Sequence, residues 1–190
     1  MKILSCGAGM QSTALALMSC ENKKEIKYKE VPIYDAVIFC DLGSEPIWVY
    51  KQVDFIKNAC EDAEIPFYIL DTHLHQDYLN NFGKRRVVSI PFWSVDENGK
   101  KGKMMRNCTL DYKINEIIKF VKYKLLGYAK YQRVKNEDLK AHEMHLGFSL
   151  EEKHRCKENN HKMFVNKFPL VEMELTRADN YKYILEKWGL

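Results

Sequence analysis

Residues 3–18 read ILSCGAGMQSTALALM, an apolar run followed by small residues and then by apolar residues at helical spacing. This order predicts a buried strand, a tight turn at residues 7–9 and a helix over about residues 11–21. A strand that passes through a turn of small residues into a helix is typical of the first unit of an α/β fold. The same unit is therefore expected to repeat along the chain.

The turn at residues 7–9 has the composition of an anion cradle. Gly7, Ala8 and Gly9 let the backbone approach a phosphate closely. Ser12 and Thr13 bring hydroxyl and N–H groups to the positive end of the following helix. The pattern has neither the Gly-Lys-Ser/Thr triplet of a Walker loop nor the three glycines of a dinucleotide fingerprint. It predicts a nucleotide phosphate here, and the alternative is a tight turn that serves only close packing.

Strand and helix alternate up to about residue 70. AVIFC at residues 36–40 is a continuous apolar run of the kind that forms a buried parallel strand. Pro46 opens a helix, and FYIL at residues 67–70 follows it as a third strand. This order predicts an α/β fold with a doubly wound, mainly parallel five-stranded sheet and helices on both faces.

Beyond residue 70 the alternation breaks. The Asn98-Gly99 turn signal lies between two short β-forming runs and predicts a hairpin or flap at about residues 87–105. A helix over about residues 109–125 and a strand over residues 142–148 come next. Ser149 followed by Glu152 has the spacing of a capping box and predicts the start of another helix.

Length and composition narrow the class of protein. The 190 residues suit one domain, residues 1–190, with a sizeable core. The chain has no run of about 18 apolar residues, which is the length needed to cross a bilayer, and its N-terminus reads as a strand. We therefore expect no membrane partner and a cytoplasmic location. The six cysteines lack the spacing of zinc sites and are expected to be reduced thiols. The net charge of +4, with basic runs in the middle third, suits a polyanionic substrate, and no helix-turn-helix or zinc-finger pattern points to nucleic acid.

Polar residues follow the second predicted strand, at the edge where doubly wound sheets bind ligands. Asp41, Gly43 and Glu45 place two carboxylates around a glycine turn. These carboxylates could hold ribose hydroxyls or a metal ion. The alternative is that Asp41 or Ser44 only caps the next helix. The six histidines show no HExxH pattern, and no metal site is predicted from them.

A second chemical cluster reads RNCTLDYKI at residues 106–114. Arg106, Thr109 at a helix start and Lys113 one turn later could clamp a phosphate or sulfate. Cys108 lies near the helix start between cationic neighbours, which favour a thiolate, so it is predicted to be a nucleophile. The alternative is a capped helix with a buried cysteine.

These segments resemble the PP-loop superfamily of adenine nucleotide alpha-hydrolase-like proteins and, within it, the phage and bacterial phosphoadenosine phosphosulfate (PAPS) reductase-like family. Gly-Met-Gln-Ser at residues 9–12 is similar to the Gly-x-Gln-Ala loop of the reductases, and residues 41–45 to their Asp-Thr-Gly-x-Glu segment. Residues 106–113 resemble the pattern Arg-x-Cys-Thr-x-x-Tyr-Lys. Residues 147–155 and 169–177 resemble a Gly-Ile-Ser-x-Asp-Glu-x-x-Arg stretch and a Pro-Leu stretch that ends in Thr-Arg.

The resemblance implies a HUP-type, Rossmann-like domain that binds an adenine nucleotide, either ATP or PAPS. The residues then expected to act in catalysis are Cys108, Arg106 and Lys113. Those expected to bind the nucleotide are Ser5, Gly7, Ala8, Gly9, Gln11, Ser12, Thr13, Asp41, Gly43, Glu45, Thr109, Glu152, Arg155 and Arg177. For the last two arginines, surface ion pairs with Glu151 or Glu174 are the alternative.

Three departures from the family pattern limit these implications. Thr109 replaces the second cysteine of a Cys-Cys segment and no CxxC follows, so no iron–sulfur cluster is expected. Neither the Glu-Cys-Gly-x-His tail of the reductases nor the C-terminal Cys-x-x-Cys of the phage relatives is present up to residue 190. Gln11 stands where the pyrophosphatases have Asp, which removes a carboxylate that would help to hold Mg²⁺ and leaves a magnesium cofactor open.

The residue types favour an enzyme that acts at the phosphate or sulfate of its nucleotide. The reaction would be AMP-forming adenylation of an acceptor, or sulfonucleotide chemistry through Cys108. Such an enzyme needs an acceptor substrate or a thiol donor as its partner. The alternative is a non-catalytic protein that binds or sequesters the nucleotide. The sequence leaves open which nucleotide and acceptor are used, and whether the chain forms a homodimer.

Overall fold

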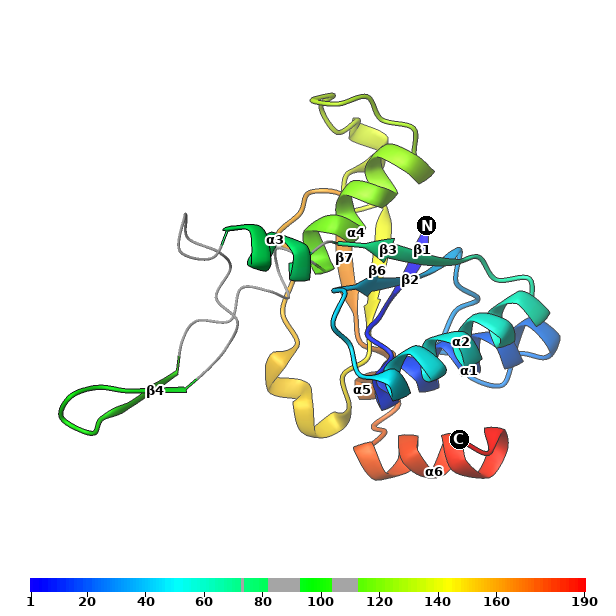
Figure 1. Ribbon diagram of the computed structural model, residues 1–190. Coiled ribbons are helices and arrows are strands. Elements are labelled where there is room, and N and C mark those ends of the chain that lie inside the picture. Colours follow the sequence, from blue (N-terminus) through cyan, green and yellow to red (C-terminus); the bar gives the residue numbers. More distant parts are fainter. Residues whose placement is uncertain (73, 82–92, 104–112) are drawn as a thin grey trace. The chain divides into compact units, whose positions relative to one another are not determined.

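The computed structural model describes residues 1–72, 74–81, 93–103 and 113–190 (Figure 1). Its main feature is an all-parallel sheet in the order β3-β2-β1-β6-β7, flanked by helices. The strands are β1 (Lys2–Cys6), β2 (Ala36–Asp41), β3 (Phe67–Asp71), β6 (His142–Leu146) and β7 (Phe164–Lys167). The predicted α/β fold with a doubly wound, five-stranded parallel sheet is therefore confirmed.

The helices differ in length and type. The longer ones are α1 (Met10–Lys24), α2 (Ile47–Asp62), α3 (Leu74–Asn81) and α6 (Arg177–Trp188). Shorter pieces are α4 (Asn115–Phe120), its π-helical continuation η2 (Val121–Leu125), the 3-10 turns η3 (Asn136–Asp138) and η4 (Leu150–Arg155), and α5 (Pro169–Glu172). None of the helices in the described ranges combines the length and the apolar character needed to cross a membrane.

The described chain forms two compact units. The core unit consists of Met1–Phe39, Pro46–Ile69 and Tyr131–Leu190, and the second unit of Cys40–Glu45 and Leu70–Lys130. The length of the chain predicts that these two units belong to one domain, and this stays a prediction.

The second unit contains the predicted hairpin. Strands β4 (Trp93–Val95) and β5 (Lys101–Lys103) pair in antiparallel fashion. Between them, the Asp96 carboxylate accepts the N–H groups of Asn98 and Lys100, and Gly99 takes a left-handed φ of 77°. The hairpin is confirmed at its tip, whereas residues 87–92, 104–105 and the start of the helix predicted from residue 109 lie outside the described residues.

Helix α1 is buried on nearly all sides within the core unit, because the sheet, α2 and α6 surround it (Figure 1). Its buried polar side chains are therefore satisfied by neighbouring backbone. The hydroxyl of Ser19 accepts the N–H of Tyr34 at 3.0 Å. The amide of Asn22 donates to the carbonyl oxygens of Tyr28 and Val31 and accepts the N–H of Tyr28. These bonds fix the loop that leads from α1 to β2.

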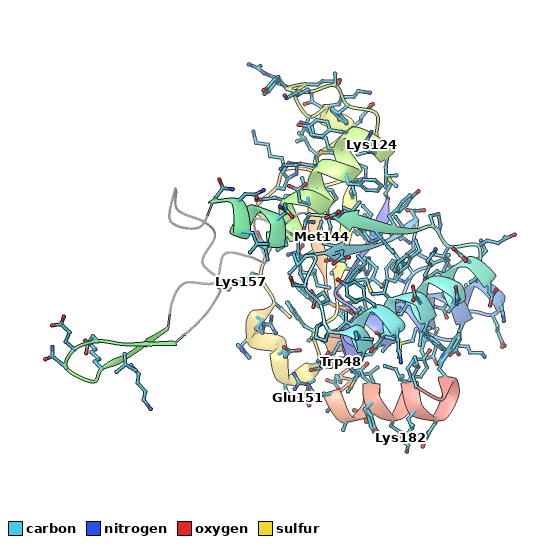
Figure 2. All side chains as sticks on the ribbon, viewed as in Figure 1. Trp48, Lys124, Met144, Glu151, Lys157 and Lys182 are labelled. Carbon is cyan, nitrogen blue, oxygen red and sulfur yellow. The ribbon has the colours of Figure 1, made fainter. Side chains whose placement is uncertain are left out.

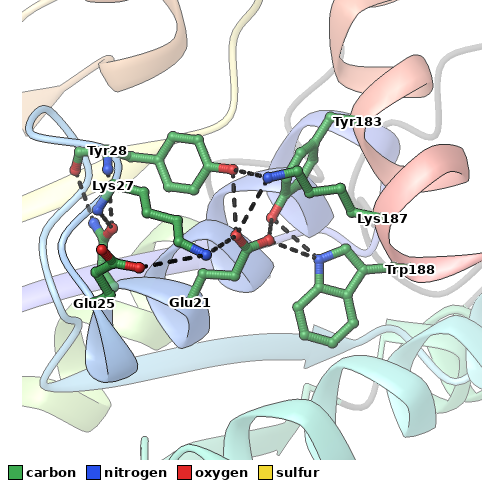
Figure 3. A network of polar contacts seen from close by, with 8 residues as sticks. Glu21, Glu25, Lys27, Tyr28, Tyr183, Lys187 and Trp188 are labelled. Atoms are coloured by element: carbon green, nitrogen blue, oxygen red, sulfur yellow. Dashed lines mark hydrogen bonds and ion pairs between the residues drawn. The ribbon is translucent and has the colours of Figure 1, made fainter.

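Glu21 joins the end of α1 to α6 (Figure 3). Its Oε1 accepts the hydroxyl of Tyr183 at 2.7 Å and the indole N–H of Trp188 at 3.2 Å. Its Oε2 lies 3.8 Å from the Lys27 ammonium and 3.7 Å from the Lys187 ammonium. Burial and the bond to this carboxylate raise the pKa of Tyr183, so the hydroxyl stays a donor. Glu21 thus supplies the acceptor that two largely buried donors of α6 require.

Two substitutions of Glu21 separate its role as a hydrogen-bond acceptor from its role in ion pairs. Glu21→Ala removes the acceptor of the Tyr183 hydroxyl and one of the two acceptors of the Trp188 indole, which keeps its bond to the Tyr183 oxygen, and is expected to lower the free energy of unfolding by about 1–3 kcal/mol. Glu21→Gln keeps an acceptor oxygen and loses only half-exposed ion pairs, so it is expected to cost less than about 1 kcal/mol. Urea denaturation measures both. The matched control is Glu25→Ala, an exposed carboxylate at the same helix end, and an equal loss in all three variants would contradict this role of Glu21.

Candidate functional site

The strand order of the sheet reverses between β1 and β6. From β1 the chain continues to β2 on one side, and β6 is followed by β7 on the other. Ser5 and Leu146 are paired at the carboxyl ends of the two central strands, so the loops that follow them leave the sheet side by side. Ligands of doubly wound sheets bind at such a switch point. The candidate site is built from these two loops, residues 7–9 and 147–149, both in the core unit.

The loop after β6 packs directly on the first turn of α1. A Cβ placed on Gly147 would lie 2.6 Å from the backbone nitrogen of Ser12 and 2.9 Å from the carbonyl carbon of Gln11. Real Cβ atoms do not approach backbone so closely, so only glycine allows the two loops to meet here. Sequence reasoning placed Gly147 in a motif but missed this contact, because the contact depends on the partner loop.

The loop after β1 is open on the side of its glycines. A Cβ at Gly7 or Gly9 would find no atom within 4 Å. Ala8, between them, has a left-handed φ of 51° and is buried. That conformation costs a non-glycine residue about 1–2 kcal/mol, and such strain is concentrated at binding sites. Gly9 is the N-cap residue of α1 and has no side chain to accept the N–H groups of the first turn.

The hydroxyls of Ser12 and Thr13 are buried and shape the loop from within. Ser12 Oγ accepts the N–H of Gly7 at 3.2 Å and donates to the carbonyl oxygen of Gly9 at 3.1 Å. Thr13 Oγ1 donates to the same oxygen at 2.9 Å and accepts the side-chain amide of Gln52 at 2.8 Å. In this structure the two hydroxyls therefore act on the loop backbone. They hold the loop in the form in which its glycines face open space.

A polar cluster connects the two loops through Glu152. Its Oε2 accepts the side-chain amide of Gln11 at 3.1 Å, and its Oε1 pairs with the guanidinium of Arg155. Ser149 Oγ lies 3.5 Å from the same carboxylate. The predicted capping box of Ser149 and Glu152 is therefore wrong: Ser149 makes no side-chain cap to the backbone, and η4 is a 3-10 turn. The carboxylate is directed toward Gln11 and Arg155, away from the backbone N–H that a capping box requires.

Two further contacts organise the cationic residues of the site. The Arg155 guanidinium lies 4.5 Å from the centre of the Phe148 ring, and Phe148 stacks on Phe168 with the ring centres 5.8 Å apart. The backbone N–H of Arg177 donates to the carboxylate of Glu151 at 3.0 Å. Hydrogen bonds from backbone N–H groups, that of Arg177 among them, hold the pKa of Glu151 below its usual range. Glu151, which Figure 2 labels, thus stabilises the start of α6.

The second unit contains the other predicted binding residues. Asp41 accepts the N–H of Gly43 at 2.7 Å, and Gly43 has a φ of 78°. The ammonium of Lys113 lies 3.5 Å from the Glu45 carboxylate. Helix α2 has Pro46, not Asp41, as its N-cap residue. Arg106, Cys108 and Thr109 lie outside the described residues, so their assignment stays a prediction.

Most of the described cysteines are buried. Cys6, Cys20, Cys40 and Cys60 are buried, and Cys156 is partly exposed. Burial raises the pKa of Cys40 to about 12 against the opposing effect of Lys113. A thiol in this environment stays protonated and unreactive near neutral pH.

No model of a known protein family matches this chain, and no curated protein matches it significantly. The resemblance to the PAPS reductase-like family therefore depends on the motifs themselves.

Alanine substitutions of Gly147 and Gly9 test which glycine is required for packing and which one faces open space. Gly147→Ala places a methyl group against backbone and is expected to lower the free energy of unfolding by about 1–3 kcal/mol. Gly9→Ala points its methyl group into open space from an extended backbone and is expected to change stability by less than about 0.5 kcal/mol. Urea denaturation of the two variants gives the comparison. A stable Gly147→Ala protein would show that the loops are not closely packed.

Proposed function

We propose that this chain is a PP-loop protein of the PAPS reductase-like kind that binds the phosphates of an adenine nucleotide at the switch point between β1 and β6. One observation carries the proposal: a strained, internally bonded loop presents two glycines to open space at the start of a buried helix. Backbone N–H groups and the positive end of a helix favour an anion at such a place. The motif order along the chain favours ATP or PAPS.

The side chains beside the loop fit an anionic ligand with a counterion. Gln11 offers an amide and Arg155 a guanidinium, and both now contact the Glu152 carboxylate. A phosphate that takes these donors displaces Glu152 or shares them with it. Mg²⁺ bound to nucleotide phosphates commonly takes only one or two protein carboxylates, and Glu152 is a carboxylate within reach of the loop. Its position compensates in part for the aspartate that Gln11 replaces.

The proposed activity is enzymatic and takes one of two forms. In adenylation, an acceptor oxygen attacks the α-phosphorus of ATP, the bond to pyrophosphate breaks, and the acceptor carries AMP. In sulfonucleotide reduction, the Cys108 thiolate attacks the sulfur of PAPS, the S–O bond breaks, and a thiol donor later releases sulfite. Arg106 and Lys113 would stabilise the developing negative charge in either case.

Binding is tested by calorimetric titration with ATP, AMP and PAPS. Binding of at least one of these is expected, and Gly9→Val is expected to abolish it because the side chain would occupy the phosphate position. Gln11→Ala removes one donor and is expected to weaken binding by roughly tenfold or less. Glu25→Ala, distant in sequence from the loop and exposed, is the control that should bind normally. If none of the three nucleotides binds the folded protein, the loop serves packing only.

Turnover is tested separately with labelled ATP or PAPS. AMP with pyrophosphate would identify adenylation, and sulfite with 3′-phosphoadenosine 5′-phosphate would identify sulfonucleotide reduction. Binding without either set of products, with acceptors and thiol donors supplied, would favour the non-catalytic nucleotide-binding protein instead.

The reactive thiol is predicted to be Cys108. At neutral pH it is expected to react with iodoacetamide before the buried cysteines, and bound nucleotide is expected to protect it. Peptide mass spectrometry after brief labelling gives the order of reaction. Earlier labelling of another cysteine, or full turnover by Cys108→Ser, would remove its assignment as the nucleophile.

A further inference from the structure

Two cysteines of the core unit face each other across the contact between α1 and α2. The Sγ atoms of Cys20 and Cys60 are 3.9 Å apart and share an S–H···S hydrogen bond. Each thiol lies in the last two turns of its helix, where the two helices are packed together (Figure 1). The pair is independent of the proposed nucleotide site, since the loop of residues 7–9 lies at the opposite end of α1.

One thiol of the pair lines a cavity. The cavity has a volume of about 420 Å³ and is lined by Cys20, by Ala59 of α2 and its C-cap residue Ala63, and by Lys24, Lys187 and Trp188, among others. Cys60 is not among its lining residues and is fully buried. A small molecule that enters the cavity therefore reaches Cys20 before Cys60.

The surroundings favour ionisation of Cys20 over Cys60. The hydrogen bond shared with Cys60 lowers the pKa of Cys20 against the effects of burial and of the Glu21 carboxylate, and the Lys24 ammonium adds to the lowering. That same bond and burial raise the pKa of Cys60. The pair thus combines one sulfur that can become a thiolate with a neighbour that keeps its proton.

We propose that Cys20 and Cys60 form a reversible redox pair, which a hydroperoxide entering this cavity oxidises to a disulfide between α1 and α2. Cys20 is the attacking thiol and Cys60 the resolving thiol. A small dithiol reductant reverses the reaction by thiol–disulfide exchange.

The reaction balances in two steps. The Cys20 thiolate attacks one oxygen of the peroxide, so that an S–O bond forms, the O–O bond breaks, and the leaving oxyanion takes up a proton. Cys20 is then a sulfenic acid. The Cys60 sulfur attacks the Cys20 sulfur, an S–S bond forms, the S–O bond breaks, and the departing hydroxide takes the Cys60 proton as water. The two thiols lose two electrons, and the peroxide gains them.

Closure of the bond requires a small local movement. A disulfide has its sulfurs about 2.05 Å apart, so the two Sγ atoms must approach by roughly 1.9 Å. Ala59, the residue before Cys60, and Ala63, the C-cap residue of α2, both line the cavity. These small residues leave room for the adjustment of side chains and helix ends.

The test is peptide mapping of the full-length protein after mild peroxide treatment. Free thiols are blocked with iodoacetamide, and the digest is analysed without reduction. A peptide joining Cys20 to Cys60, lighter than the two thiol peptides by two hydrogen atoms, is expected as the main cross-link, and dithiothreitol should remove it. In Cys60→Ala, Cys20 should stop at the sulfenic acid and be trapped by dimedone.

Controls separate the pair from general oxidation. Cys20→Ala should leave Cys60 without a dimedone adduct, whereas Cys40→Ala removes another buried thiol and should keep the Cys20–Cys60 cross-link. Near-ultraviolet circular dichroism verifies that each variant is folded. The proposal is overturned if folded wild-type protein yields no such cross-link, if the cross-link forms only in urea, or if Cys20 is not trapped by dimedone in folded Cys60→Ala.

Discussion

The burial of α1 on nearly all sides is the constraint on which the rest of the core unit depends. A helix in this position cannot leave a polar side chain unbonded without a cost of about 1–3 kcal/mol per group. Ser12 and Thr13 therefore bond to the loop before the helix, and Ser19 and Asn22 to the loop after it. One buried element thus determines the shape of the backbone at both of its ends.

This constraint explains why the candidate site is formed before any ligand arrives. The loop after β1 is held by hydroxyls that face inward, and the loop after β6 is held by the close approach of Gly147 to α1. Gln11, Glu152 and Arg155 are joined by side-chain contacts that a ligand could exchange. A site built in this way loses little conformational entropy on binding, because its backbone is already fixed.

The sequence predicted the sheet and its first three strands, because continuous apolar runs and a proline at a helix start are local signals. It did not identify β7 as the fifth strand, since Phe164–Lys167 is short and only Phe164 is fully buried. The capping box was expected at Ser149, where the Glu152 carboxylate bonds to Gln11 and Arg155 instead, and it forms at Thr176 with Asp179. The inward turn of the Ser12 and Thr13 hydroxyls and the contact of Gly147 depend on the packing of distant segments, which local spacing does not encode.

The central position of β1 has a consequence for folding during synthesis. Its N-terminal residue Lys2 is paired with Glu143 of β6, whereas its other neighbour, β2, begins at Ala36. On the ribosome, one edge of β1 therefore remains without its partner strand until most of the chain has been made. Exposed apolar strand edges invite pairing with other nascent chains, and closure of such distant contacts is slow. The order of the strands thus leaves this edge of β1 open to mispairing until β6 has been made.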